Sequence, residues 1–206
     1  NAVTTYNGHT YVLVSGEADN MTDTDSTEAT VAGSMPNNAV EVTFTYELDE
    51  IGPEGPDGIP DKYQVVFNYE AADTNGTVTG TVREVVTQRN ADGDYDNTVA
   101  VNPTQPSTVT ANTGYHFVNW TGAGSTEYAT DEELKAVSFT TDQTFKAHFA
   151  ANENSLTVKH VYHGDREVTG VTNTSKDAVA TAYGTPVSEN AVTTYNGHTY
   201  VLVSGE

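Results

Sequence analysis

Apolar and polar residues alternate with a period of two along much of the chain. The clearest runs are Val40–Tyr46 and Leu156–Tyr162. Successive side chains of a strand point to opposite faces, so this pattern predicts strands with one buried face. Further strands are predicted at Tyr63–Tyr69, Thr77–Val86, Val99–Val101, Ser107–Thr110 and Thr144–Phe149.

Helical patterns are few. Asp131–Val137 predicts a short helix, because its acidic residues fall in the first turn, where the helix dipole favours negative charge. Lys176–Tyr183 is a second helix candidate. Many strands with one or two short helices indicate a β-rich α+β fold.

Proline and glycine divide the chain into pieces. Residues 49–60 hold three prolines and three glycines, which predicts a stiff acidic linker. A shorter junction is expected near Ala151–Asn154. Between these two breaks lies one complete module, residues 61–150.

An internal repeat sets the larger organisation. Residues 1–17 return without a change as residues 190–206, an offset of 189 positions. This period is far longer than the roughly 20–50 residues of solenoid repeats, so each unit must hold one or two whole domains. On this interpretation residues 1–48 are the C-terminal part of a second module, and residues 155–206 are the N-terminal part of its next copy.

Composition narrows the classes of partner. With 29 acidic against 8 basic residues, the formal net charge is −21, which argues against nucleic acid and anionic membrane surfaces as partners. The absence of cysteine removes disulfides and thiolate metal sites. No run of 18 apolar residues occurs, so we expect no membrane insertion in this segment. This composition suits the exterior of a Gram-positive cell.

The second module, joined through the repeated residues, resembles the mucin-binding (MucBP) repeats of Gram-positive surface proteins. The resemblance rests on Ser155–Tyr162, Val187–Leu202 and Val42–Leu48. The family's Gly-Tyr-x-Leu element has a looser counterpart here, Gly197–Leu202 and its copy Gly8–Leu13. The resemblance implies a module of the kind found in cell-surface adhesins.

The central module is similar to the internalin-type B repeats. The matching residues are Tyr63–Tyr69, the Gly-Tyr-x-Phe-x-x-Trp core at Gly114–Trp120, and the closing run Phe139–Phe149. Together the two resemblances imply two small ubiquitin-like or β-grasp modules arranged end to end. They also imply an extracellular, cell-wall-attached adhesin of a Gram-positive bacterium.

Three functions follow from these resemblances. The first is adhesion to host mucin or its glycans, where linked weak sites would bind by avidity. The second is immunoglobulin binding through an exposed sheet edge or aromatic patch, as in superantigen-like surface proteins. The third is a passive stalk that holds another domain away from the cell wall.

Tyrosines in the repeated segment are the candidate ligand-binding residues. Exposed tyrosines make good contacts because they lose little conformational entropy on binding. Strand geometry predicts that about half of them face inward. The candidates are Tyr6, Tyr11, Tyr195 and Tyr200.

A second aromatic group has two readings. Tyr115, Phe117 and Trp120 could form a platform for stacking a sugar ring. A small module with one tryptophan more often places it in the core, so we expect a structural role.

One acidic loop has the composition of a calcium site. Asn90, Asp92, Asp94 and Asp96 place oxygen-bearing side chains at every second position, a spacing that lets a loop wrap Ca²⁺. The later bidentate glutamate of an EF-hand is missing, so an ordinary acidic turn is the favoured interpretation. Residues 57–61 echo the end of such a loop more weakly.

No motif predicts catalysis. The sequence has no Ser-His-Asp elbow, HExxH run, phosphate-binding glycine loop or cysteine nucleophile, so we expect a binding or spacer module and not an enzyme.

If the two partial modules complete each other, residues 155–206 of one chain would meet residues 18–48 of the next in head-to-tail contacts.

Overall fold

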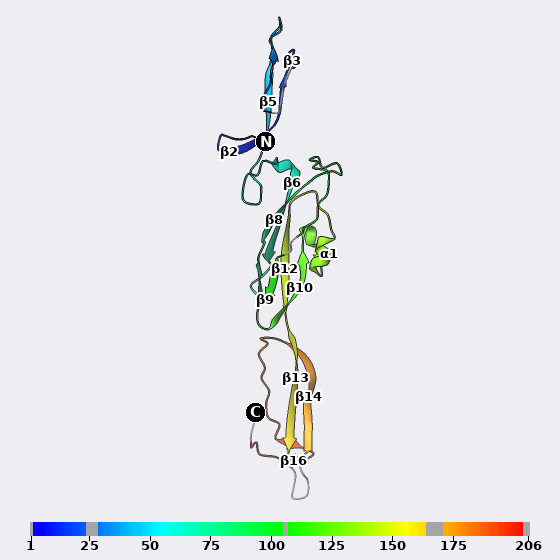
Figure 1. The fold of residues 1–206 in the computed structure, drawn as a ribbon. Helices are drawn as coiled ribbons and strands as arrows, with labels where there is room; N and C mark the ends of the chain where they lie inside the picture. The colour runs from blue at the N-terminus through cyan, green and yellow to red at the C-terminus, as the bar shows by residue number, and fades with distance from the viewer. Residues whose placement is uncertain (1, 24–28, 105–106, 164–170, 204–206) are drawn as a thin grey trace.

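The computed structural model describes residues 2–23, 29–104, 107–163 and 171–203. Strands dominate, and they form three units that follow one another along a single long axis (Figure 1). The predicted β-rich class is therefore confirmed. Residues 204–206, the end of the second repeat copy, lie outside the described residues.

The N-terminal unit is a narrow antiparallel sheet in the order β1-β2-β5. Asn7 (φ 50°) and Gly8 (φ 85°) form the tight turn between the first two strands. An Asn-Gly pair suits this turn, because both residues adopt the left-handed conformation at low cost. The strands are β1 Val3–Tyr6, β2 His9–Ala18 and β5 Val42–Leu48, with β3 Thr22–Asp23 and β4 Gly33–Ser34 as a short side pair.

The central unit is built on a five-stranded sheet in the order β11-β10-β12-β6-β8. Its first and last strands, β6 and β12, lie side by side and are parallel, whereas the other pairs are antiparallel. The pair β7-β9 forms a separate ribbon. The elements are β6 Gln64–Ala71, β7 Gly76–Thr79, β8 Arg83–Thr87, β9 Thr108–Ala111, β10 Tyr115–Thr121, β11 Glu127–Tyr128, α1 Asp131–Lys135 and β12 Gln143–Ala151.

An aromatic core lies between this sheet and the segments that cover it. Phe67, Trp120, Leu134 and Phe145 have no exposed surface. The Trp120 indole N–H donates to Asp131 Oδ1 at 2.7 Å, which satisfies its polar atom inside the core. The expected core role of Trp120 is confirmed, and it is not available as a stacking platform.

The predicted helix at Asp131–Val137 is confirmed as the shorter α1. The side chain of Thr130 accepts from Glu133 N at 3.2 Å, and the Glu133 carboxylate accepts from Ala129 N at 2.8 Å. This reciprocal arrangement satisfies N–H groups that have no partner inside a helix. It fixes the helix start, so that Leu134 points into the core.

Two predicted strands take a different form. Thr77–Val86 was expected as one strand, but Gly80 (φ 88°) turns the chain and separates β7 from β8. Val99–Val101 contributes only an isolated bridge between Val101 and Phe139.

The C-terminal unit is a long antiparallel hairpin followed by a second copy of the tight turn. β13 Glu153–Tyr162 pairs with β14 Val171–Ala182, and β15 Thr194–Tyr195 pairs with β16 His198–Thr199. The helix predicted at Lys176–Tyr183 is wrong. Its residues lie mostly in β14, because pairing with β13 supplies hydrogen bonds from a distant segment and Val179 and Thr181 favour extended backbone.

Candidate functional site: the two joints between units

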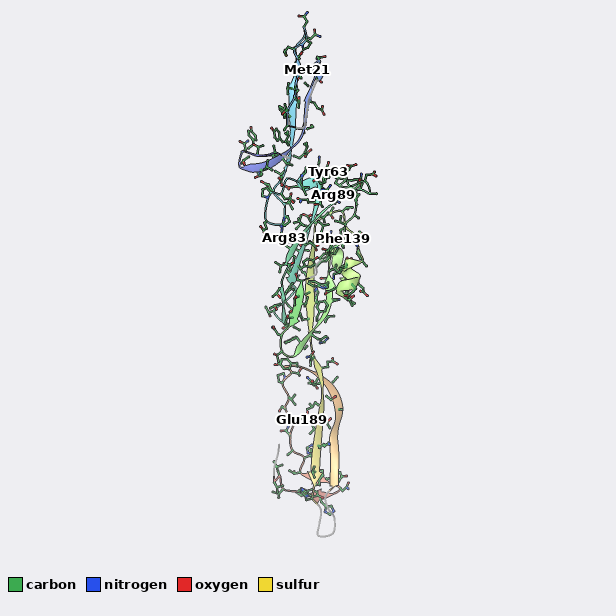
Figure 2. The ribbon with its side chains drawn as sticks, in the orientation of Figure 1. Met21, Tyr63, Arg83, Arg89, Phe139 and Glu189 are labelled. Carbon is green, nitrogen blue, oxygen red and sulfur yellow. The ribbon has the colours of Figure 1, made fainter. Side chains whose placement is uncertain are left out.

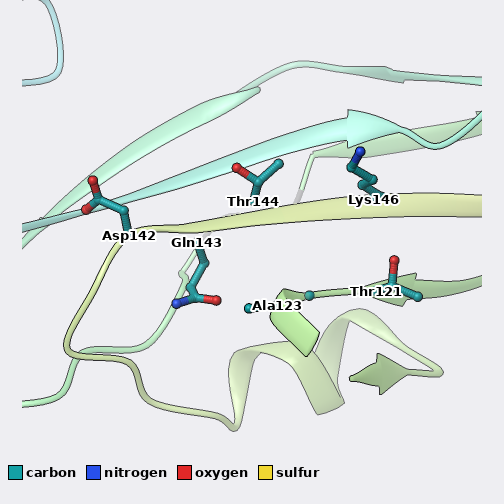
Figure 3. Close-up of a pocket in the computed structure, with 7 residues that line it drawn as sticks. Thr121, Ala123, Asp142, Gln143, Thr144 and Lys146 are labelled. Atoms are coloured by element: carbon teal, nitrogen blue, oxygen red, sulfur yellow. The ribbon is translucent and has the colours of Figure 1, made fainter. Parts of the chain in front are cut away.

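The surface depression in Figure 3 offers little chemistry. It has a volume of about 290 Å³ and is lined by Thr121, Gly122, Ala123, Asp142, Gln143, Thr144 and Lys146. The Asp142 carboxylate accepts from Val66 N at 2.8 Å, and Lys146 Nζ lies 3.2 Å from Glu70 Oε1. Both charged residues are thus engaged with the protein, and no aromatic ring lines the depression for a sugar to stack on.

The upper joint, residues 49–63, is organised by two aspartates. Asp49 is fully buried, and its two carboxylate oxygens accept from Asp57 N at 3.0 Å and Gly58 N at 2.9 Å. Asp61 Oδ1 accepts from Glu50 N at 2.8 Å and Ile51 N at 2.9 Å. A buried carboxylate is tolerated when N–H donors satisfy it, and such charge-assisted bonds are strong. The two side chains therefore fold the linker back on itself.

The same joint is bonded to the sheets on both sides. Asp49 N donates to Thr10 O at 2.9 Å in the N-terminal unit. On the other side Arg83 Nη1 donates to Gly52 O at 2.8 Å, and Gln64 Nε2 donates to Asp57 Oδ2 at 2.8 Å. The linker is thus a folded connection between two sheets, which holds their relative orientation.

One ion pair and one histidine–carboxylate contact lie on the outside of the upper joint. Lys62 Nζ is 2.7 Å from Glu47 Oε1, and His9 Nδ1 is 2.8 Å from Glu50 Oε1. The hydrogen bond that Lys62 donates to the Glu47 carboxylate raises the pKa of Lys62. All four side chains are about a third or more exposed, so solvent screening keeps the contribution of each pair small.

Tyr63 and Arg89 lie at the upper end of the central unit (Figure 2), and both side chains contact the Tyr95 ring. The rings of Tyr63 and Tyr95 stack with centroids 5.3 Å apart. The guanidinium of Arg89 lies 4.1 Å from the centroid of the Tyr95 ring. Tyr63 ends the upper joint, so this stack extends the joint into the loop that follows β8.

The lower joint consists of one residue, Asn152, between β12 and β13. Its N–H donates to Gly114 O at 2.8 Å, its carbonyl accepts from Tyr183 N at 2.7 Å, and its side-chain Oδ1 lies 2.9 Å from His116 Nδ1. Asn152 therefore bonds to the β10 end of the central unit and to the end of β14. The backbone passes between units without a loop.

Gly114 and two tyrosines complete the lower joint. Tyr115 and Tyr183 meet edge to face, with ring centroids 5.9 Å apart. Gly114 has a φ of +86°, and a Cβ at this position would come within 2.3 Å of the Tyr183 ring. Only glycine therefore allows the backbone of the central unit to lie against Tyr183.

The four candidate tyrosines of the repeat do not share one surface. Tyr6 is 68% exposed on β1, and Tyr11 is half-buried on β2. In the C-terminal unit, Tyr195 and Tyr200 pack against Tyr162 with centroid distances of 4.5 and 4.9 Å. Figure 1 shows β2 and β16 on opposite sides of the central unit, so the two pairs lie far apart.

The candidate calcium loop is shaped by its own hydrogen bonds. Asn90 Oδ1 accepts from Asp92 N at 3.0 Å and Asp94 N at 2.9 Å. Asp96 Oδ1 accepts from both the N–H and the hydroxyl of Thr98, and these bonds lower the pKa of Asp96. Within the described part of the chain, no group of three or more His, Asp or Glu side chains is arranged to hold a metal ion. Calcium binding here stays a prediction.

A buried hydroxyl in the central sheet links β6 to β8. Tyr69 is 3% exposed, and its hydroxyl donates to Glu84 Oε2 at 3.0 Å. Burial raises the pKa of Tyr69, and the nearby carboxylate of Glu84 raises it further. Glu84 also accepts from Thr104 N at 3.1 Å, so its carboxylate ties the loop before β9 to the sheet.

No helix among the described residues is long and apolar enough to cross a membrane. No family model matches the sequence, and neither the curated proteins nor the solved structures yield a match. Sequence patterns predicted the positions of the two joints but not the hydrogen bonds that form them. These joints are the features of the described residues that bear most directly on function.

Proposed function

We propose that the chain is a rod-forming spacer segment of a repeat-containing adhesin, located on the wall of a Gram-positive cell. The observation that carries this proposal is the construction of the two joints. Each joint is hydrogen-bonded to the units on both sides, so the units are held in line and do not swing on flexible linkers. A stalk needs this property, because only an extended chain keeps a distal domain far from the wall.

The strand order of the central unit supports the module type that the resemblance implies. Parallel pairing of the first and last strands at the middle of the sheet is the arrangement expected of a β-grasp. The short α1 lies between β11 and β12, whereas a ubiquitin-like module carries its main helix between the second and third strands. The fold proposed for the central unit is therefore a variant of the β-grasp.

Packing of the repeated tyrosines argues for spacing over ligand binding. Tyr195 has the same sequence surroundings as the exposed Tyr6, yet it stacks on Tyr162 when β13 and β14 are present. A tyrosine covered in this way is a structural contact. A mucin-binding or immunoglobulin-binding role would have to use Tyr6 of the first copy or another surface.

Distance measurements between the two ends test the stalk. The chain has no cysteine, so Met35→Cys and Val187→Cys, both at exposed positions, allow paired fluorescent labels. We expect one narrow distance distribution by single-molecule energy transfer. Asp49→Ala should broaden it by loosening the upper joint, whereas Asp92→Ala, an exposed acidic residue outside both joints, should leave it unchanged. A broad distribution in the labelled parent chain would contradict the proposal.

Binding assays separate the stalk from the two adhesive alternatives. The chain is applied to purified mucin, to mucin stripped of glycans, and to immunoglobulin as Fab and Fc fragments. A spacer binds none of them. Binding to mucin that disappears with the glycans would establish the first alternative, and binding to either antibody fragment would establish the second.

A further inference from the structure

The two copies of the repeated segment have identical sequences but different burial. In the first copy Val12 and Leu13 are 0% and 5% exposed. Their counterparts Val201 and Leu202 are 86% and 61% exposed. The Asn-Gly turn is the same, with Asn196 at φ 49° and Gly197 at φ 79°. The turn is therefore common to both copies, but Tyr11–Val14 lie in β2, whereas their counterparts 200–203 lie in no strand and have no strand equivalent to β5 beside them among the described residues.

The partner in the first copy is β5. Antiparallel pairing places Tyr11 opposite Leu48, Val12 opposite Glu47 and Leu13 opposite Tyr46. His198 and Thr199 of the second copy pair with β15, and Tyr200 N also donates to Thr193 O at 2.6 Å. On the side that corresponds to β5, this acceptor segment, residues 198–203, has no strand partner among the described residues, and Val201, Leu202 and Val203 are exposed.

The second copy has contacts that the first lacks. Tyr195 and Tyr200 pack on Tyr162, which is 5% exposed at the end of β13. Each copy therefore has a different contact partner: the repeated segment contacts β5 in the first copy and the β13-β14 hairpin in the second. The contact with β5 is made by backbone pairing, whereas the contact with Tyr162 is made by the side chains of Tyr195 and Tyr200.

Strand β5 also has an uncovered face. Its alternate residues Val42, Phe44, Tyr46 and Leu48 are apolar or aromatic and are 38–47% exposed. Such a row is typical of a strand whose face is covered in the complete domain. The face has no cover among the described residues of its own unit, whereas β13 and β14 form a hairpin without a third strand.

We infer that the acceptor segment binds a strand with the sequence of β5, Val42–Leu48, supplied by another copy of this repeat. The register carries over from the first copy: Leu48 opposite Tyr200, Glu47 opposite Val201, and Tyr46 opposite Leu202. Backbone hydrogen bonds give the added strand its affinity, and the cross-strand pairs of Leu48 with Tyr200 and Tyr46 with Leu202 give it specificity. The partner is thus a second copy of the repeat, independent of any adhesive ligand.

A synthetic peptide of residues 38–50, fluorescently labelled and titrated with the full chain, tests this inference. We expect saturable one-to-one binding measured by anisotropy. Leu202→Asp in the chain should weaken it by about tenfold or more, because a charge enters the pairing surface. The matched control Val187→Asp adds the same charge at a position that is also exposed but lies outside the acceptor segment, and it should leave binding unchanged.

A peptide carrying Glu47→Pro keeps the apolar row but removes the backbone donor opposite Val201, and it should also bind about tenfold or more weakly. Segment-resolved hydrogen exchange locates the bound strand. Exchange should slow by about tenfold or more at residues 198–203, with no change at residues 9–18, where β5 of the chain is already paired. No saturable binding, or binding that is insensitive to Leu202→Asp, would overturn the inference. Protection confined to another strand would do the same.

Discussion

The two joints connect neighbouring units in different ways. The upper joint is a linker of fifteen residues, 49–63, rich in proline and glycine and folded by the carboxylates of Asp49 and Asp61. The lower joint is a single residue, Asn152, between two strands. Stiffness therefore does not follow from linker length. It follows from how many backbone groups of the joint are bonded to the units that it connects.

Removing the Asp49 carboxylate should have the largest effect. Asp49→Ala leaves the N–H groups of Asp57 and Gly58 without their acceptor, and unsatisfied donors of this kind cost about 1–3 kcal/mol each. We expect a loss of about 2–4 kcal/mol in the free energy of unfolding, measured by urea denaturation. Asp92→Ala serves as the control. An unchanged denaturation midpoint would show that the upper joint contributes nothing to stability.

Gly114→Ala should come next, and it acts on the lower joint. The new Cβ combines a strained positive φ with a clash against the Tyr183 ring. We expect a loss of about 2–3 kcal/mol. In the Tyr183→Ala background the loss caused by Gly114→Ala should be smaller, because the clash is gone and only the strain remains. If Gly114→Ala costs as much in that background as in the parent chain, the clash is not the cause.

The side chain of Asn152 should matter less than its backbone. Asn152→Ala removes the contact with His116 but keeps the bonds of the main chain to Gly114 and Tyr183. We expect the free energy of unfolding to fall by about 1 kcal/mol, since the lost hydrogen bond is exposed. Hydrogen exchange at Tyr183 N–H should remain slow. Rapid exchange there would show that the side chain of Asn152, and not its backbone, holds the lower joint together.

The Lys62–Glu47 pair should have the smallest effect. Lys62→Met is expected to cost about 0.5 kcal/mol or less, after allowance for screening by solvent. The pKa of Lys62 is raised in the folded chain, so the pair stabilises below the ordinary lysine value of 10.5 and is lost as pH rises through the folded pKa. The difference between Lys62→Met and the parent chain should therefore vanish at strongly alkaline pH. A difference that persists there would point to lost packing of the lysine stem.

Sequence patterns predicted β6, β9 and β12 of the central unit, where a closed core enforces the alternation of residues such as Phe67 and Tyr69. They did not predict β10 or β11 as strands, and they merged β7 with β8. They failed at residues 176–183, where a helix was expected. That segment carries alanine and charged residues that suit a helix locally. Its strand depends on β13, a pairing partner that no local pattern specifies.

The joints were located by proline, glycine and a break in the alternation, but their chemistry was not predicted. Asp49 and Asp61 bracket the proline-rich segment, and this placement is the one signal that could have suggested carboxylates folding the linker. Nothing in the sequence marks Asn152 as the single connecting residue. The tyrosine candidates show the same limit, because identical sequences gave Tyr6 an exposed position and Tyr195 a packed one.

The parallel neighbours β6 and β12 determine how tension would act on the molecule. A pull on the two ends enters the central unit at the start of β6 and leaves at the end of β12. These strands would be drawn in opposite directions, which loads their paired residues, from Gln143–Phe67 to Ala147–Ala71, together in shear. Bonds loaded together must break together, whereas the strands of a hairpin peel apart one pair at a time. The sheet is therefore oriented to resist stretching along the long axis.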